Sequence, residues 1–124
     1  MYDIHCHILP NIDDGPKKLE EALGMARIAA TDGTRVVIAT PHGGQVEAKG
    51  GREALSQRVH DFNLELKSAA IDLRVVIGVE HFLATQLLDE VQVGSAISLN
   101  NSRYLLVEID FMQYPHYMDE ALFQ

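Results

Sequence analysis

The sequence predicts an α/β fold, built as the first part of a parallel barrel. Short runs rich in β-branched residues alternate with stretches of helical periodicity, and this alternation is typical of βα units around a mostly parallel sheet. Four such steps fit into the 124 residues, whereas a complete eight-unit barrel takes about 250 residues. We therefore expect residues 1–124 to form one partial barrel domain.

The first βα unit is expected between residues 1 and 33. The run Tyr2–His5 predicts a strand, followed by a loop rich in Pro, Asn, Asp and Gly. Apolar residues then recur at helical spacing from Leu19 to Ala30. Pro16 suits the first turn of this helix, and Gly33 suits its end.

The following units are less regular in length. Arg35–Ala39 is a β-branched run and predicts the second strand. The nine residues Gly43–Gly51 hold four glycines and predict a mobile flap over the site, with a helix following to about Ala70. Further along we expect a strand at Arg74–Val79, a helix at Ala84–Val91, a strand at Tyr104–Glu108 and a helix at Tyr117–Gln124.

Composition excludes several classes of protein. The net charge of -8 with only 10 Lys and Arg argues against binding to a nucleic-acid backbone. No run of 18 apolar residues indicates a membrane span, and the N-terminus has no signal-peptide pattern. The single cysteine, Cys6, leaves no internal disulfide, so a cytoplasmic location is expected. An open sheet edge in a partial barrel predicts self-association.

The segment His5-Cys6-His7 follows the first predicted strand. Strand residues two apart point the same way and lie about 7 Å apart, so two imidazoles can reach one ion with bonds of about 2.0–2.1 Å. Cys6 should point the other way, into the core. Two hydrogen-bonded surface histidines would be an equally acceptable explanation of this pair alone.

Metal-competent side chains also follow the other predicted strands. His42 lies just past the second strand, Glu80 ends the third and Glu108 ends the fourth. The carboxyl ends of parallel barrel strands share one mouth, where chemistry collects. A carboxylate such as Glu80 can bridge two cations, and Asp110 shares strand parity with Glu108 as a reserve candidate.

The segment Asp13-Asp14-Gly15-Pro16 precedes the first predicted helix. An aspartate here can cap the helix or bind metal, and we favour Asp14 as a ligand, with Asp13 as a cap or a support. The remaining histidines are not expected to be ligands: His60 should face solvent, His81 should point away from its neighbour Glu80, and His116 lies in a loop that could approach a substrate.

These residues together resemble the PHP (polymerase and histidinol phosphatase) superfamily. More narrowly, the chain resembles the bacterial manganese-dependent protein-tyrosine phosphatases of capsule and exopolysaccharide synthesis. The resemblance runs in order through five segments, Asp3–Pro10, Ile12–Pro16, Ala39–His42, Gly78–Glu80 and Tyr104–Glu108. His-x-His is shared by many hydrolases, whereas the extension Leu-Pro-x-Ile-Asp-Asp-Gly is much more specific.

The resemblance implies the N-terminal portion of a distorted (β/α)7 PHP barrel with up to three Mn²⁺ ions. It implies a metal-bound hydroxide as the nucleophile and, as substrate, the phosphotyrosine tail of a bacterial tyrosine autokinase. It assigns the ions in this way: the first to His5, His7 and Glu80, the second to Glu80 and Glu108, and the third to Asp14 and His42.

Two departures from the family pattern weaken this expectation. The family usually has a second histidine after His42, where this chain has Gly43. A later histidine and a later Asp-x-His pair have no counterpart before Gln124, so metal binding and turnover are expected to be weak. Two alternatives stay open: an amidohydrolase or TatD-like nuclease, and an inactive module that binds metal or a partner.

Overall fold

The computed structural model describes residues 1–112 and 114–123. In chain order its elements are β1 (Tyr2–Cys6), α1 (Leu19–Thr31), β2 (Val36–Ala39), α2 (Gly43–Ala48), α3 (Gly51–Ser68), β3 (Arg74–Ile77), β4 (Glu80–Phe82), α4 (Thr85–Gln92), the 3₁₀ helix η1 (Leu99–Asn101), β5 (Leu106–Glu108) and α5 (Met118–Phe123). Gln124, the end of the predicted last helix, lies outside the described residues. None of the helices in the described part is both long and apolar enough to cross a membrane.

The larger part of the molecule is a parallel sheet covered by helices. Strands β1, β2 and β3 pair in that order, all parallel, which confirms the mixed α/β class. Inward residues of the strands, such as Val37 and Val75, join one hydrophobic core with Ala22 and Ala26 of α1. Helix α3 adds buried residues at helical spacing, Leu55, Val59, Phe62 and Leu66.

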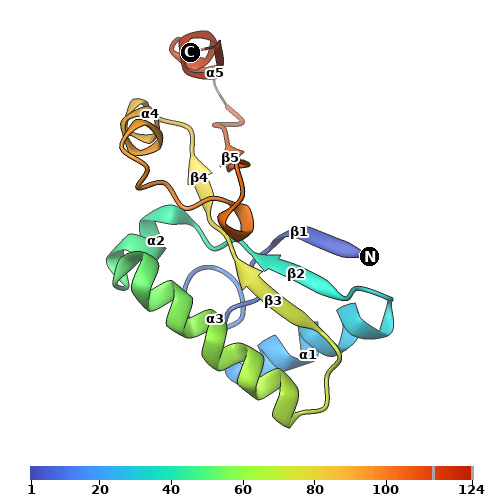
Figure 1. Cartoon of the computed structure of the whole chain (residues 1–124). Helices are drawn as coiled ribbons and strands as arrows, with labels where there is room; N and C mark the ends of the chain where they lie inside the picture. Colours follow the sequence, from blue (N-terminus) through green and yellow to red (C-terminus); the bar gives the residue numbers. More distant parts are fainter. Residues whose placement is uncertain (113, 124) are drawn as a thin grey trace.

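The C-terminal elements form an arm above this body (Figure 1). Strands β4 and β5 pair in parallel as a separate two-stranded sheet. A second hydrophobic cluster holds Leu83, Leu87 and Met118 together, and the hydroxyl of Tyr117 donates to the carbonyl of Leu83 at 2.9 Å. The arm therefore has its own small core, and β4 connects it to the body.

The predicted loop at Gly43–Gly51 is wrong, because most of this segment is helical. Helix α2 begins at Gly43 and is anchored by the buried side chain of Val46. The glycines needed for a turn are those at the α2–α3 junction, where Gly50 and Gly51 have φ angles of 106° and 72°. Two of the four glycines thus serve the turn, while Gly43 and Gly44 open a helix.

The predicted third strand is also too long. β3 ends at Ile77, and Glu80 begins β4 of the second sheet rather than ending the third strand. At Gly78 the backbone passes so close to β2 that an added Cβ would lie 2.7 Å from Cγ2 of Ile38. The fourth predicted strand shortens to β5 and pairs with β4.

The first helix begins later than expected. α1 begins at Leu19, so Pro16 does not occupy its first turn. The carboxylate of Glu21 accepts hydrogen bonds from the backbone N–H groups of Lys17 and Lys18 at 2.8 and 3.2 Å. Asp13 lies too far upstream to cap α1, so the capping explanation of that residue is wrong.

Candidate metal centre

The end of β1 departs from regular pairing and turns two histidines toward one point. The register between β1 and β2 shifts between Asp3 and Cys6. There the Cys6 N–H donates to Oγ1 of Thr40 at 3.0 Å, and the Thr40 N–H donates to the Cys6 carbonyl at 2.9 Å. His5 lies within this irregularity and His7 just past it, and their Nε2 atoms are 3.3 Å apart.

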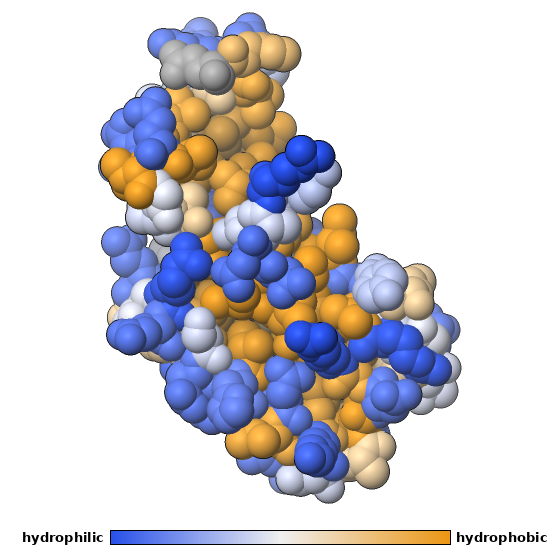
Figure 2. All heavy atoms as spheres, viewed as in Figure 1, coloured by the Kyte–Doolittle hydropathy of each residue, from blue (hydrophilic) through white to orange (hydrophobic). Residues whose placement is uncertain are grey.

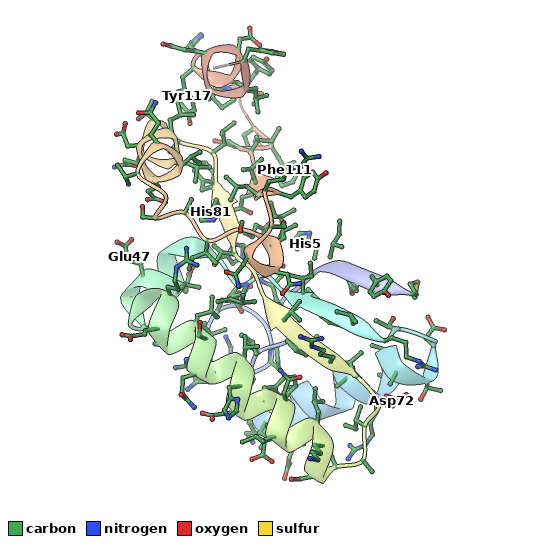
Figure 3. The ribbon with its side chains drawn as sticks, in the orientation of Figure 1. His5, Glu47, Asp72, His81, Phe111 and Tyr117 are labelled. Carbon is green, nitrogen blue, oxygen red and sulfur yellow. The ribbon has the colours of Figure 1, made fainter. Side chains whose placement is uncertain are left out.

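Glu80 closes a first group of donor atoms with these histidines. Its carboxylate oxygens lie 3.3 Å from Nε2 of His5 and 3.0 Å from Nε2 of His7. Ligand atoms bonded to a shared ion at about 2.0–2.2 Å lie about 3–3.5 Å from one another. The spacing therefore fits a single cation, and Figure 3 shows His5 where β1 reaches the junction of the body with the arm.

Asp13 supports this group from behind. Its Oδ2 accepts a hydrogen bond from Nδ1 of His7 at 2.6 Å and one from the His42 N–H at 3.2 Å. Its Oδ1 accepts from the Gly15 N–H at 3.0 Å. A carboxylate that binds one ring nitrogen of a histidine fixes the ring and leaves the other nitrogen for a metal. Asp13 thus orients Nε2 of His7 toward Glu80.

The electrostatics of the His7–Asp13 pair agree with this arrangement. Burial alone lowers the pKa of His7, but the hydrogen bond to Asp13 and the nearby carboxylates outweigh it and raise that pKa above its usual value. Burial raises the pKa of Asp13, but the hydrogen bonds from His7 and from two backbone N–H groups outweigh it and lower that pKa. Asp13 is therefore held as the anion.

Asp14 lies in a different environment from its neighbour. The Asp13 side chain is fully buried, whereas 75% of the Asp14 side chain is exposed. Oδ1 of Asp14 lies 3.4 Å from Nε2 of His42 and 3.6 Å from Nδ1 of His7. This places an accessible carboxylate at the edge of a second group, formed by His7, Asp13, Asp14 and His42.

A third group joins the body to the arm. Nδ1 of His42 lies 3.4 Å from Glu80 and 3.6 Å from Glu108 of β5. The His42 and Glu80 backbones form an isolated parallel bridge, in which the Glu80 N–H donates to the Pro41 carbonyl at 3.0 Å. His42 turns one ring nitrogen toward each of two groups, and a neutral ring offers a lone pair on only one of them.

The donor chemistry fits divalent cations. The three groups contain only imidazole nitrogens and carboxylate oxygens, a set suited to Mn²⁺, Zn²⁺ or Fe²⁺ rather than to thiolate-seeking metals. Cys6 packs against the core, and burial, with a smaller contribution from Asp3, raises the pKa of its thiol to about 11. A cavity of about 340 Å³ opens on the third group, lined in part by His42, Glu80, Glu108 and Phe82.

All six side chains expected as ligands belong to these groups: His5, His7, Asp14, His42, Glu80 and Glu108. The reserve candidate Asp110 does not, and its Oδ1 instead accepts from the Met112 N–H at 2.8 Å. His60 and His116 are exposed, and His81 is buried and directed away from the groups. Sequence reasoning missed Thr40, whose position directly before Pro41-His42 at a strand end was its only signal.

Comparison with known proteins identifies the family. Residues 1–124 match the family described as capsular polysaccharide synthesis, CpsB/CapC. The chain belongs to this CpsB/CapC family. It is similar to tyrosine-protein phosphatase YwqE of Bacillus subtilis (strain 168), with 33% identity over 123 residues, which cover 99% of this chain and 48% of YwqE. Putative tyrosine-protein phosphatase CapC of Staphylococcus aureus is 27% identical over 124 residues, covering 100% of this chain and 49% of CapC.

The resemblance to CpsB/CapC proteins extends from the sequence to the fold, as a solved structure shows. This structure is described as crystal structures of YwqE from Bacillus subtilis and CpsB from Streptococcus pneumoniae, unique metal-dependent tyrosine phosphatases. The TM-score is 0.90 at 34% identity, over 97% of this chain and 49% of that chain. This CpsB/CapC chain therefore spans about half the length of the relatives it matches.

Proposed function

We propose that this CpsB/CapC chain carries the metal-binding part of a metal-dependent protein-tyrosine phosphatase. The observation that supports it is the convergence of three groups of donor atoms around Glu80, a residue common to two of them. Tyrosine phosphatases of the same family resemble this chain in sequence and in fold. Neither relative nor structure favours an amidohydrolase or a nuclease.

The residues divide into three ligand sets in this proposal. The first ion is held by His5, His7 and Glu80, the second by Glu80 and Glu108, and the third by Asp14 and His42. Asp13 is a support because its side chain is fully buried and already accepts three hydrogen bonds. When bound, divalent ions at such a site activate water and neutralise charge on phosphoryl oxygens.

The chain's own residues then have distinct tasks. Asp13 keeps the His7 ring in one orientation, and the buried Glu80 carboxylate keeps the first and third groups together. The cavity beside His42 and Glu108 leaves these groups open to a phosphoryl group. Because the exposed Asp14 has few protein contacts, it can adjust as a ligand arrives.

The wider assignment follows the family. We propose Mn²⁺ as the metal, the phosphotyrosine tail of a bacterial tyrosine kinase in capsule synthesis as the substrate, and a distorted PHP barrel as the complete fold. The single cysteine is consistent with a cytoplasmic protein. The two parallel sheets, joined at the His42–Glu80 bridge, are consistent with successive strands of one curved barrel.

Metal content and turnover, measured on the same sample, test the proposal. The chain is loaded with Mn²⁺, freed of excess metal and analysed for bound manganese, and hydrolysis of a phosphotyrosine peptide is followed by phosphate release. Bound manganese with hydrolysis that a chelator abolishes is the expected result. Bound manganese without hydrolysis would reduce this chain to a metal-binding module, and absence of both would refute the proposal.

A further inference from the structure

A second and larger cavity adjoins the metal centre. It measures about 520 Å³ and lies between α2, the start of α3, β4 and α4, within the range of about 300–1,000 Å³ that is usual for ligand sites. Gly43, Gly44 and Phe82 line both this groove and the cavity beside His42 and Glu108. The two cavities therefore adjoin at these residues, two of which are glycines without a side chain.

Gly43, which stands where the family usually has a second histidine, lies where the two cavities adjoin. A Cβ placed on Gly43 would lie 3.4 Å from Cγ1 of Val79 and 3.7 Å from Nδ1 of His81. A larger side chain at this position would stand at the junction of the two cavities. With glycine, an extended chain can pass from the metal centre into the groove.

His81 offers an unused hydrogen-bond acceptor in the groove. The residue is only 8% exposed, and its Nε2 lies 2.8 Å from the Ile97 carbonyl. A carbonyl oxygen only accepts, so Nε2 carries the proton and Nδ1 is the acceptor of the neutral ring. Within the described part of the chain, Nδ1 has no hydrogen-bond partner, and it faces Gly43.

The walls of the groove are apolar, and its rim is acidic. Val46, Val79 and Ile97 are buried along it. Glu47 of α2 and Glu90 of α4 lie exposed at the rim, and neither has an ion pair with any of the described residues. Figure 3 shows Glu47 extending toward the side on which α4 lies, with His81 on β4 between these helices.

The positively charged side chain that lines the groove, Arg52, already has hydrogen-bond partners. The guanidinium of Arg52 donates to the carbonyls of Ser95 and Ala96, at 3.5 and 3.2 Å. Its position ties α3 to the segment after α4. The two glutamates are thus left to attract a positive charge from a ligand.

We propose that this groove binds the peptide segment beside the phosphotyrosine of the substrate. An apolar side chain of the peptide occupies the floor, a peptide N–H donates to Nδ1 of His81, and a Lys or Arg lies between Glu47 and Glu90. That the bound peptide segment belongs to a phosphotyrosine substrate rests on the proposed function. Recognition by the groove itself needs neither metal nor hydrolysis.

A charge-reversal experiment tests the groove. Two pools of fluorescein-labelled peptides carry a central phosphotyrosine flanked on both sides by mixtures of Leu, Phe, Gly and either Lys or Glu, and binding is measured by fluorescence polarisation. We expect the chain to prefer the Lys pool. In Glu90→Lys this preference should fall by about five-fold or reverse, because an exposed attractive pair becomes repulsive.

Asp89→Lys is the matched control. It makes the same change in net charge one residue away, on the face of α4 that lines a small cavity with Gln92 and Tyr117 instead. An equal shift in both variants, or no preference in the unaltered chain, would overturn the proposal. So would a dimer that Glu90→Lys dissociates, because the groove would then belong to a second copy.

Dephosphorylated pools, measured with metal chelated, separate this inference from the proposed function. Selectivity for the Lys pool under these conditions supports the groove even if manganese binding or turnover fails. The ¹⁵N shift of His81 Nδ1 gives a second readout, and it should move on saturation with the Lys pool. An unchanged shift would refute the hydrogen bond assigned to His81.

Discussion

At the scale of single residues, Glu80 is the position on which the metal centre depends most. Its carboxylate lies within 3.0–3.4 Å of three histidines, His5, His7 and His42. Glu80→Gln keeps the shape of the side chain but removes its negative charge from the two groups of donor atoms to which Glu80 belongs. We expect Mn²⁺ affinity, measured by isothermal titration, to fall by more than the about 10–100-fold that loss of a supporting residue costs.

Glu65→Gln provides the control for this change. Glu65 is exposed on α3 and belongs to none of the three groups. Its variant should bind Mn²⁺ as the unaltered chain does. Equal affinity in Glu80→Gln and Glu65→Gln would show that Glu80 is not a ligand.

Asp13→Asn tests the supporting role of the buried neighbour. An amide cannot supply two anionic oxygens to His7, Gly15 and His42 at once, so the His7 ring should lose its fixed orientation. Mn²⁺ affinity should fall by about 10–100-fold, while Asp14→Asn should affect only the ion at the open edge beside Asp14. If Asp14→Asn instead abolishes all binding, the roles of the two aspartates are different from those proposed.

Much of the candidate site could be predicted at this scale. Strand-end placement selected His42, Glu80 and Glu108, and the structure brings all three together. The sequence favoured Asp14 over Asp13 only weakly, because the difference between the two depends on burial and on hydrogen bonds from residues as distant as His42. Such contacts have no signature in the local sequence.

At the scale of secondary structure, the break between β3 and β4 decides where Glu80 points. Gly78→Ala would bring a Cβ within 2.7 Å of Ile38 and 3.0 Å of Leu99. Overpacking of this kind costs about 1–3 kcal/mol, so the urea midpoint should fall. Gly24→Ala inside α1 meets no atom within 4 Å and should stabilise the chain by about 0.5–1 kcal/mol. An unchanged urea midpoint in Gly78→Ala would contradict the close packing of Gly78 against β2.

The sequence predicted well the helices in which apolar residues recur at helical spacing. It predicted poorly the segments in which glycine can belong either to a loop or to a helix. α1, α3 and α4 lie close to the expected ranges because their apolar residues recur at helical spacing. Gly43–Gly51, which includes α2, was predicted as a flap because it holds four glycines, and the burial of Val46 that anchors α2 is not visible in the sequence. Glu80 was assigned to the wrong strand because the break at Gly78 depends on contact with β2, a tertiary effect.

At the scale of the whole molecule, apolar surface remains uncovered along two edges. β1 is an edge strand and exposes Tyr2 and Ile4, and the arm exposes Phe111 and Met112, with Phe111 95% exposed. Figure 2 shows apolar surface over much of the arm and on the body below it. Exposed apolar patches of this kind commonly mark interaction surfaces, and unpaired strand edges favour association.

We therefore expect the isolated chain to self-associate, which light scattering across a dilution series would detect. Because each copy carries a net charge of -8, association should strengthen as salt screens the repulsion. The double variant Ile4→Lys/Phe111→Lys should be monomeric at concentrations where the unaltered chain is not. Ile28→Lys, at an exposed position on α1 that belongs to neither edge, should still associate. Weaker association with added salt, or monomers in all three proteins, would show that these edges do not mediate contacts between copies.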